Sequence, residues 1–196
     1  MNEEDIRSQL KEKNKEIYLN KLNLDLTNNL EVLVLSIDNL LNNLSFDTKN
    51  KVLGIAESFQ NENTIKESIN NFIENYRIFL MTLIDNKKEK IETMYKENID
   101  LNTYKDKLQK FNIEIRENLN NYFKNNIDNL VDTIIINYKD SFCNLRIKEY
   151  LKNIFKDNLN NKVLDIINSR DIILLNTFKE SFLKYLELNK NTVGVE

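Results

Sequence analysis

The side chains able to do chemistry in this sequence are carboxylates, lysines, tyrosines and a single thiol, because histidine is absent and cysteine occurs once, at Cys143. Without imidazole the chain lacks the commonest general base and cannot build a Ser–His or Cys–His nucleophile pair. One cysteine and no histidine exclude a zinc site. Gly54 and Gly194, the only glycines, are too few for a phosphate-binding loop. We therefore expect no catalytic residue, no metal and no cofactor, and a protein that is not an enzyme.

Paired carboxylates are the remaining candidates for a cation site. Glu89 and Glu92 lie three residues apart, as do Glu114 and Glu117, and this spacing places both carboxylates of a pair on one helix face. Lysine or arginine stands close to each pair, which favours a solvated face with ion pairs. Cys143 is interpreted as a small apolar side chain.

Lysines gather on both sides of residues 98–103, a polar stretch that we interpret as a hairpin between two long helices. They are the candidate nucleic-acid contacts: Lys87, Lys88, Lys90, Lys105, Lys107 and Lys110. Such a cluster can bind phosphates, but acids such as Asp85, Glu97 and Asp106 lie among the lysines and weaken the positive field. A nucleic-acid-binding regulator is therefore the alternative, and a protein partner is favoured.

The overall composition gives no sign of a strongly charged partner. Lysine and arginine number 28 against 31 acids, which leaves a net charge of −3. The abundance of asparagine and the lack of proline are typical of an AT-rich genome, and we consider a phage or plasmid origin. No apolar run is long enough to span a bilayer or resembles a signal peptide, and a lone cysteine suits a reducing compartment. We expect a cytoplasmic protein without a transmembrane segment.

Long amphipathic helices must position these side chains. The clearest one covers residues 19–44, where leucine or isoleucine recurs every three or four residues and keeps one face apolar. This stripe consists of Leu19, Leu22, Leu26, Leu30, Leu33, Ile37, Leu40 and Leu44. We expect it to form the core of the protein or a contact between subunits, in the manner of a coiled coil.

Apolar stripes predict further helices over residues 52–60, 65–97, 104–138, 147–167 and 172–186. Polar, cap-forming stretches at 45–48, 140–144 and 169–171 are interpreted as breaks between them. No convincing strand pattern occurs. The predicted fold is all-α, an elongated up-and-down bundle of five or six helices. It forms a single domain over residues 1–188, with a sub-boundary near 98–103 and a disordered tail at 189–196.

The favoured function is that of a non-catalytic helical interaction protein, such as a scaffold, an adaptor, an assembly subunit or a small inhibitor or regulator. A homo-oligomer is consistent with this interpretation, because long helices often expose apolar surface that one chain cannot cover. The sequence leaves open the identity of the partner, the oligomeric state, the source organism and the face that is functional.

Overall fold

The computed structural model describes residues 2–55, 62–135 and 141–193. The elements are α1 (Glu3–Ile55), α2 (Glu62–Lys96), α3 (Leu101–Ile135), α4 (Ser141–Lys152), the π-helix η1 (Asn153–Leu159) and α5 (Asn160–Val193). No strand occurs in these three stretches, which confirms the predicted all-α class.

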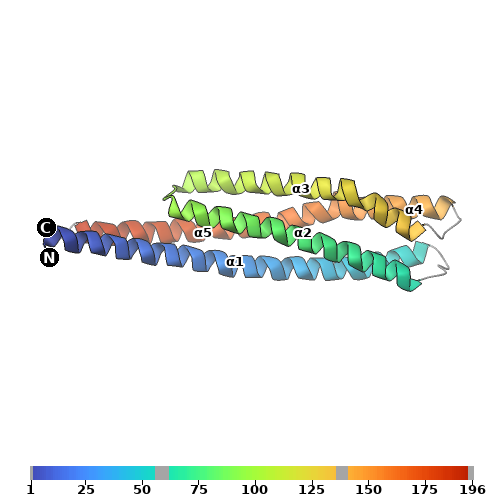
Figure 1. Ribbon diagram of the computed structural model, residues 1–196, viewed down its shortest axis with the longest axis horizontal. Coiled ribbons are helices and arrows are strands. Elements are labelled where there is room, and N and C mark those ends of the chain that lie inside the picture. Colours follow the sequence, from blue (N-terminus) through green and yellow to red (C-terminus); the bar gives the residue numbers. More distant parts are fainter. Residues whose placement is uncertain (1, 56–61, 136–140, 194–196) are drawn as a thin grey trace.

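Four long rods make up the bundle, because α4, η1 and α5 follow one another without a gap. The chain runs back and forth along one long axis, and both termini lie at the same end (Figure 1). The rod of α1 packs against α2 and α5, and that of α3 packs against the same two neighbours. The prediction of five or six helices was therefore slightly too high, since two of the expected breaks, at 45–48 and 169–171, lie inside continuous rods.

Helix α1 continues through the break predicted at residues 45–48. Thr48 and Val52 are fully buried, so the buried face of α1 continues for about two more turns beyond Leu44. This burial outweighs the local preference of serine, aspartate and threonine for a cap. At the other end, the backbone N–H of Asp5 donates to Asn2 Oδ1 at 2.8 Å, which caps the helix.

The hairpin between α2 and α3 is short and well defined. Asn98 has a φ of 58°, in the left-handed region that asparagine tolerates better than most residues at the end of a helix. Asp100 then caps α3, accepting a hydrogen bond from the N–H of Thr103 at 2.7 Å. Just inside the hairpin, the hydroxyl groups of Tyr95 and Tyr104 lie 2.8 Å apart and join the two helices.

The fourth rod owes its π-helix to an unusual spacing of buried residues. Buried positions recur at every fourth residue: Ile147, Leu151, Phe155, Leu159, Val163, Ile167 and Asp171. In an α-helix each step of four overshoots a full turn by about 40°, so this series would rotate away from the core. The i→i+5 winding of η1 takes up more residues per turn and returns the series to the core side.

Two boundaries predicted for this rod differ from the structure. The break expected at Ser169–Asp171 is absent, because α5 runs through these residues and Asp171 is buried. Residues 189–193, which were predicted to belong to a disordered tail, are part of α5. Residues 136–140 and 194–196 lie outside the described part of the chain.

Helices α1 and α5 project together beyond the α2–α3 hairpin (Figure 1). At the level of the hairpin, the ring of Phe178 lies 4.6 Å from that of Tyr104. Further out, Tyr18 stacks on Tyr185 with 4.5 Å between ring centroids, and Asn14 Nδ2 donates to Asn189 Oδ1 at 3.4 Å. The outer end of the molecule is therefore a two-helix projection.

Candidate interaction site

A buried ion pair lies in the middle of the bundle. Lys87 on α2 places its Nζ 2.7 Å from Oδ1 and 2.9 Å from Oδ2 of Asp171 on α5. The two side chains are only 3% and 10% exposed. Burial lowers the pKa of Lys87, and the charge of Asp171 and its hydrogen bond offset part of that shift. Such a pair is costly to break, because either partner left alone would be a buried, uncompensated charge.

The other two helices join this pair through asparagines. Asn112 on α3 accepts a hydrogen bond from Lys87 Nζ at 2.9 Å and donates to Asp171 Oδ2 at 2.6 Å. Asn29 on α1 donates to the backbone carbonyl of Arg170 and accepts from Arg170 Nε, both at 3.1 Å. Lys87 uses all three of its donors inside the protein. We call these five residues the polar layer, and its geometry links four helices.

A second polar contact lies further along the bundle. The hydroxyl of Tyr76 donates to Asn160 Oδ1 at 3.2 Å, and Asn160 Nδ2 donates to Asn120 Oδ1 at 3.0 Å. Burial raises the pKa of Tyr76 above its ordinary range, so its phenol stays protonated to a higher pH than a free tyrosine. Like the polar layer, this contact fixes the positions of α2, α3 and α5 relative to one another.

A groove of about 520 Å³ runs over the polar layer between α3 and α5. Asn112 and Asp171 form part of its lining, together with the apolar side chains of Leu108 and Leu164. On its rim, Ile113 and Ile172 are 57% and 61% exposed, which is high for large apolar residues. This groove is a concave surface at which apolar side chains of α3 and α5 meet solvent.

Two basic residues also line the groove, Lys105 and Arg116. Neither forms an ion pair within residues 2–55, 62–135 and 141–193. The one carboxylate of the lining belongs to Asp171, which is engaged with Lys87. The groove therefore combines an apolar rim with uncompensated positive charge.

The lysines predicted as nucleic-acid contacts do not form one exposed patch. Lys87 is buried and is not on the surface where the prediction placed it. Lys90 Nζ lies 2.9 Å from Glu114 and 5.2 Å from the ring centroid of Phe111, and Lys88 Nζ lies 3.9 Å from Glu92. Three further members of the predicted set are exposed on α3: Lys105, Lys107 and Lys110. The pairing with acids compensates much of the charge on α2.

The predicted leucine stripe lies along the inner side of α1. Its buried members are Leu22, Leu26, Leu30, Leu33 and Ile37, and its half-buried members are Leu19, Leu40 and Leu44. Leu41, one residue beyond the predicted position, is the buried residue of the next turn. Within one chain the stripe therefore packs against the core.

The groove, by contrast, was not anticipated. Its rim residue Ile113 falls outside the apolar stripe of α3, so no periodic signal distinguishes it. Ile172 was counted in the stripe predicted over residues 172–186, but its side chain is 61% exposed. The polar layer did leave a signal, because Lys87 follows Ile84 by three residues and precedes Ile91 by four, in phase with buried positions.

Other kinds of site find no support among the described residues. No group of three or more His, Cys, Asp and Glu side chains in this part of the chain is placed to hold a metal ion. Cys143 Sγ is half-buried and donates to the carbonyl of Ile55 at 3.8 Å. None of the helices in the described ranges combines the length and the apolar character needed to cross a membrane.

A scan against protein-family models, a search of curated proteins and a search of solved structures each returned no match for this chain.

Proposed function

We propose that this chain is a non-catalytic interaction protein that binds an acidic amphipathic helix of a partner protein in the groove between α3 and α5. The observation that carries this proposal is the exposure of Ile113 and Ile172 on the two sides of the groove. Large apolar side chains that flank a concavity are typical of surfaces that bind a helix.

The charges of the groove favour an acidic partner. Lys105 and Arg116 stand on α3 about three turns apart, so they can pair with acids spaced along a helix that lies parallel to the groove. Asp171 does not repel such a partner, because Lys87 neutralises it. Guanidinium and ammonium groups on the rim of an apolar contact favour acidic sequences and reject basic ones.

The polar layer supports this function by fixing the two walls of the groove. Asn112 and Asp171 are bonded to each other at 2.6 Å, and both line the groove. A preorganised groove binds with a smaller loss of conformational freedom than a mobile one. A scaffold, an adaptor, an assembly subunit or a small regulator would all act in this way. We place the interaction in the cytoplasm, because the single Cys143 suits a reducing compartment.

The proposal is tested by placing a photo-crosslinking amino acid at position 172 and, as a control, at position 78. Ile78 on α2 is exposed to a similar degree but lies away from the groove. Crosslinking in the host cell should join position 172, and not position 78, to one protein through an acidic amphipathic segment. A synthetic peptide of that segment should lose affinity at least tenfold for the Arg116→Glu variant. Adducts of equal yield at both positions, or adducts with nucleic acid, would refute the proposal.

A further inference from the structure

A second apolar stripe runs along the outer side of α1, apart from the buried one. It consists of Ile6, Leu10, Ile17, Leu24, Leu35 and Phe46, each between 45% and 64% exposed. Successive members are separated by 4, 7, 7, 11 and 11 residues. Each of these separations is close to a whole number of helical turns, so the side chains share one face. We call this stripe the outer seam.

The outer seam is long, narrow and almost straight. From Ile6 to Phe46 it extends about 60 Å along α1, because a helix rises about 1.5 Å per residue. A helix about 10 Å wide lying along it would bury about 600 Å² of each partner, or about 1,200 Å² in total. This area reaches the lower limit of stable protein interfaces. The partner must therefore be a helix of similar length, and α1 of a second copy has that length.

We propose that the outer seam pairs with the outer seam of a second copy, with the two α1 helices antiparallel about a twofold axis near residue 26. Ile6 and Phe46 lie equally far from this position, so Ile6 meets Phe46 of the second copy. Ile17 and Leu35 are related in the same way. Leu24 and its symmetry mate stand on either side of the axis. Leu10 and Leu24 fall level with Asn42 and Asn28 of the second copy, so two apolar contacts, Ile6–Phe46 and Ile17–Leu35, each form twice about the axis, as in an isologous interface.

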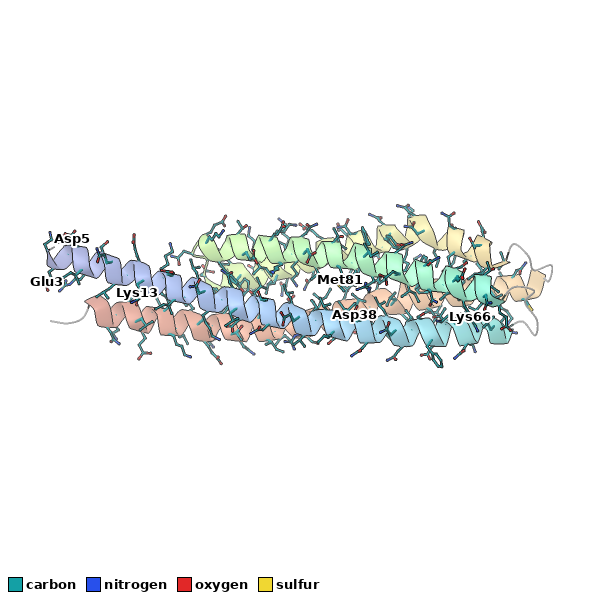
Figure 2. All side chains as sticks on the ribbon, turned by 60° about the horizontal axis from the view of Figure 1, so that its bottom comes forward. Glu3, Asp5, Lys13, Asp38, Lys66 and Met81 are labelled. Carbon is teal, nitrogen blue, oxygen red and sulfur yellow. The ribbon has the colours of Figure 1, made fainter. Side chains whose placement is uncertain are left out.

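One pair of charges beside the seam agrees with this register. The charged residues three or four positions from a seam residue are Glu3, Arg7, Lys13, Lys21, Glu31, Asp38 and Lys49. Twofold pairing brings Lys13 level with Asp38 of the second copy, within one residue. Figure 2 labels these two residues well apart along α1. The Asp38 side chain is 33% exposed; its Oδ1 is buried and lies 3.5 Å from Arg77 Nη1 of the same chain, which leaves Oδ2 for the second copy.

The other charges do not face each other across the axis, because their axial counterparts lie on the opposite flank of the seam. Glu3 falls level with Lys49 of the second copy, and Lys21, which also holds its own Asp25 at 2.7 Å, falls level with Glu31. Arg7 falls level with an uncharged residue, Ser45. The Lys13–Asp38 contact, together with the length of the seam, therefore favours a second copy of this chain in the antiparallel orientation.

Sedimentation equilibrium tests the pairing directly. The full chain should show twice the 23.4 kDa of one protomer, and the Leu24→Glu and Leu35→Glu variants should show the mass of one. Ile78→Glu, on an exposed position of α2 outside the seam, should remain dimeric. Far-ultraviolet circular dichroism should show equal helix content for all variants. A monomeric wild-type chain at its highest soluble concentration, or a dimer that survives both seam variants, would overturn the proposal.

The orientation is tested by disulfide formation in a Cys143→Ser background. The double variant Lys13→Cys with Asp38→Cys should give a covalent dimer under mild oxidation, because each new thiol meets its counterpart from the other copy. The single variant Lys13→Cys should remain uncrosslinked, since its symmetry mate lies far along the seam. A covalent dimer of the single variant would mean that the helices are parallel, and the proposed register would then be wrong.

Discussion

The ammonium group of Lys87 lies 2.7 Å from a carboxylate oxygen of Asp171, although α2 and α5 do not pack side by side in the described part of the chain. The contact crosses the bundle diagonally and passes through its centre. The most polar point of the core is therefore shared by helices whose backbones remain apart. A slip of one helix along the axis would separate these charges inside the protein.

Removing one partner of this pair should be severely destabilising. Lys87→Met leaves Asp171 buried and uncompensated, and we expect it to lower the free energy of unfolding by about 3–5 kcal/mol. The double variant Lys87→Met with Asp171→Leu should recover most of this loss, because no charge then remains in the core. Urea unfolding at neutral pH, followed by circular dichroism, measures both values.

The matched control for this experiment is Lys90→Met on the same helix. Lys90 pairs with Glu114, but the two side chains are 50% and 42% exposed, so water screens the interaction. The expected loss is below about 1 kcal/mol. If Lys87→Met cost no more than Lys90→Met, the buried pair would have no special role in stability.

Core packing along α1 should be sensitive to truncation at Ile37. This residue is fully buried, so Ile37→Ala should cost about 2–5 kcal/mol through lost burial and a cavity. Ile78→Ala removes the same atoms from an exposed position and should change the free energy of unfolding by less than about 0.5 kcal/mol. Chemical denaturation of both variants gives the comparison, and equal losses would contradict the assignment of the inner face of α1.

The hairpin turn depends on the backbone of Asn98. Its φ is 58°, and alanine prefers a negative φ more strongly than asparagine does. Asn98→Ala should therefore lower the free energy of unfolding by about 1 kcal/mol. Asn98→Gly should remain within a few tenths of a kcal/mol of wild type, because glycine adopts this φ without strain. Thermal melts of the three proteins test the order, and an alanine variant as stable as the glycine variant would speak against a left-handed residue here.

Alkaline pH should destabilise the protein through Tyr18. Burial raises the pKa of Tyr18 to about 12, and the nearby Tyr185 adds to the shift. The folded state thus keeps a proton that the unfolded state loses above its pKa of about 10. The stabilising contribution is complete below pH 10 and is lost as the pH rises toward 12.

This effect is measured as the difference in unfolding free energy between wild type and Tyr18→Phe across the alkaline range. Burial lowers the pKa of Lys87, so its contribution to stability changes with pH in the opposite direction. Both proteins contain Lys87, so this contribution cancels in the difference. The difference should stay constant to pH 10 and then shift in favour of Tyr18→Phe. A difference that does not change with pH would show that Tyr18 is solvated.

Helical stripes were readable from the sequence because burial imposes a spacing of three or four residues, as at Leu22, Leu26 and Leu30. The breaks were not readable. Serine, threonine, asparagine and aspartate are so frequent in this composition that they occur inside helices as well as at their ends. Thr48 and Asp171 are examples, since each is a cap-forming residue that lies buried within a helix. Tertiary packing, rather than the local signal, determined where the rods end.

The interaction surfaces were hidden for a different reason. An exposed apolar residue such as Leu35 or Ile172 has no meaning until the buried face of its helix is known. Lys87 shows the converse case. A lysine with charged neighbours in the sequence is predicted to be exposed, although the spacing of Lys87 from Ile84 and Ile91 matches that of buried residues. Only the packing of four rods separates these residues into inner and outer positions.

Helices α1 and α5 lie side by side and project together at one end of the molecule (Figure 1). This arrangement makes the pair weak against a force that pulls the two helices apart at that end. A force that pulls the start of α1 away from the end of α5 would open the pair like a zipper. It would load one layer of contacts at a time instead of shearing many layers together. The Tyr18–Tyr185 stack would yield early, and the Asn29–Arg170 contact would resist later, where α2 and α3 support the pair. Pulling from the opposite end of the bundle would meet all four rods at once.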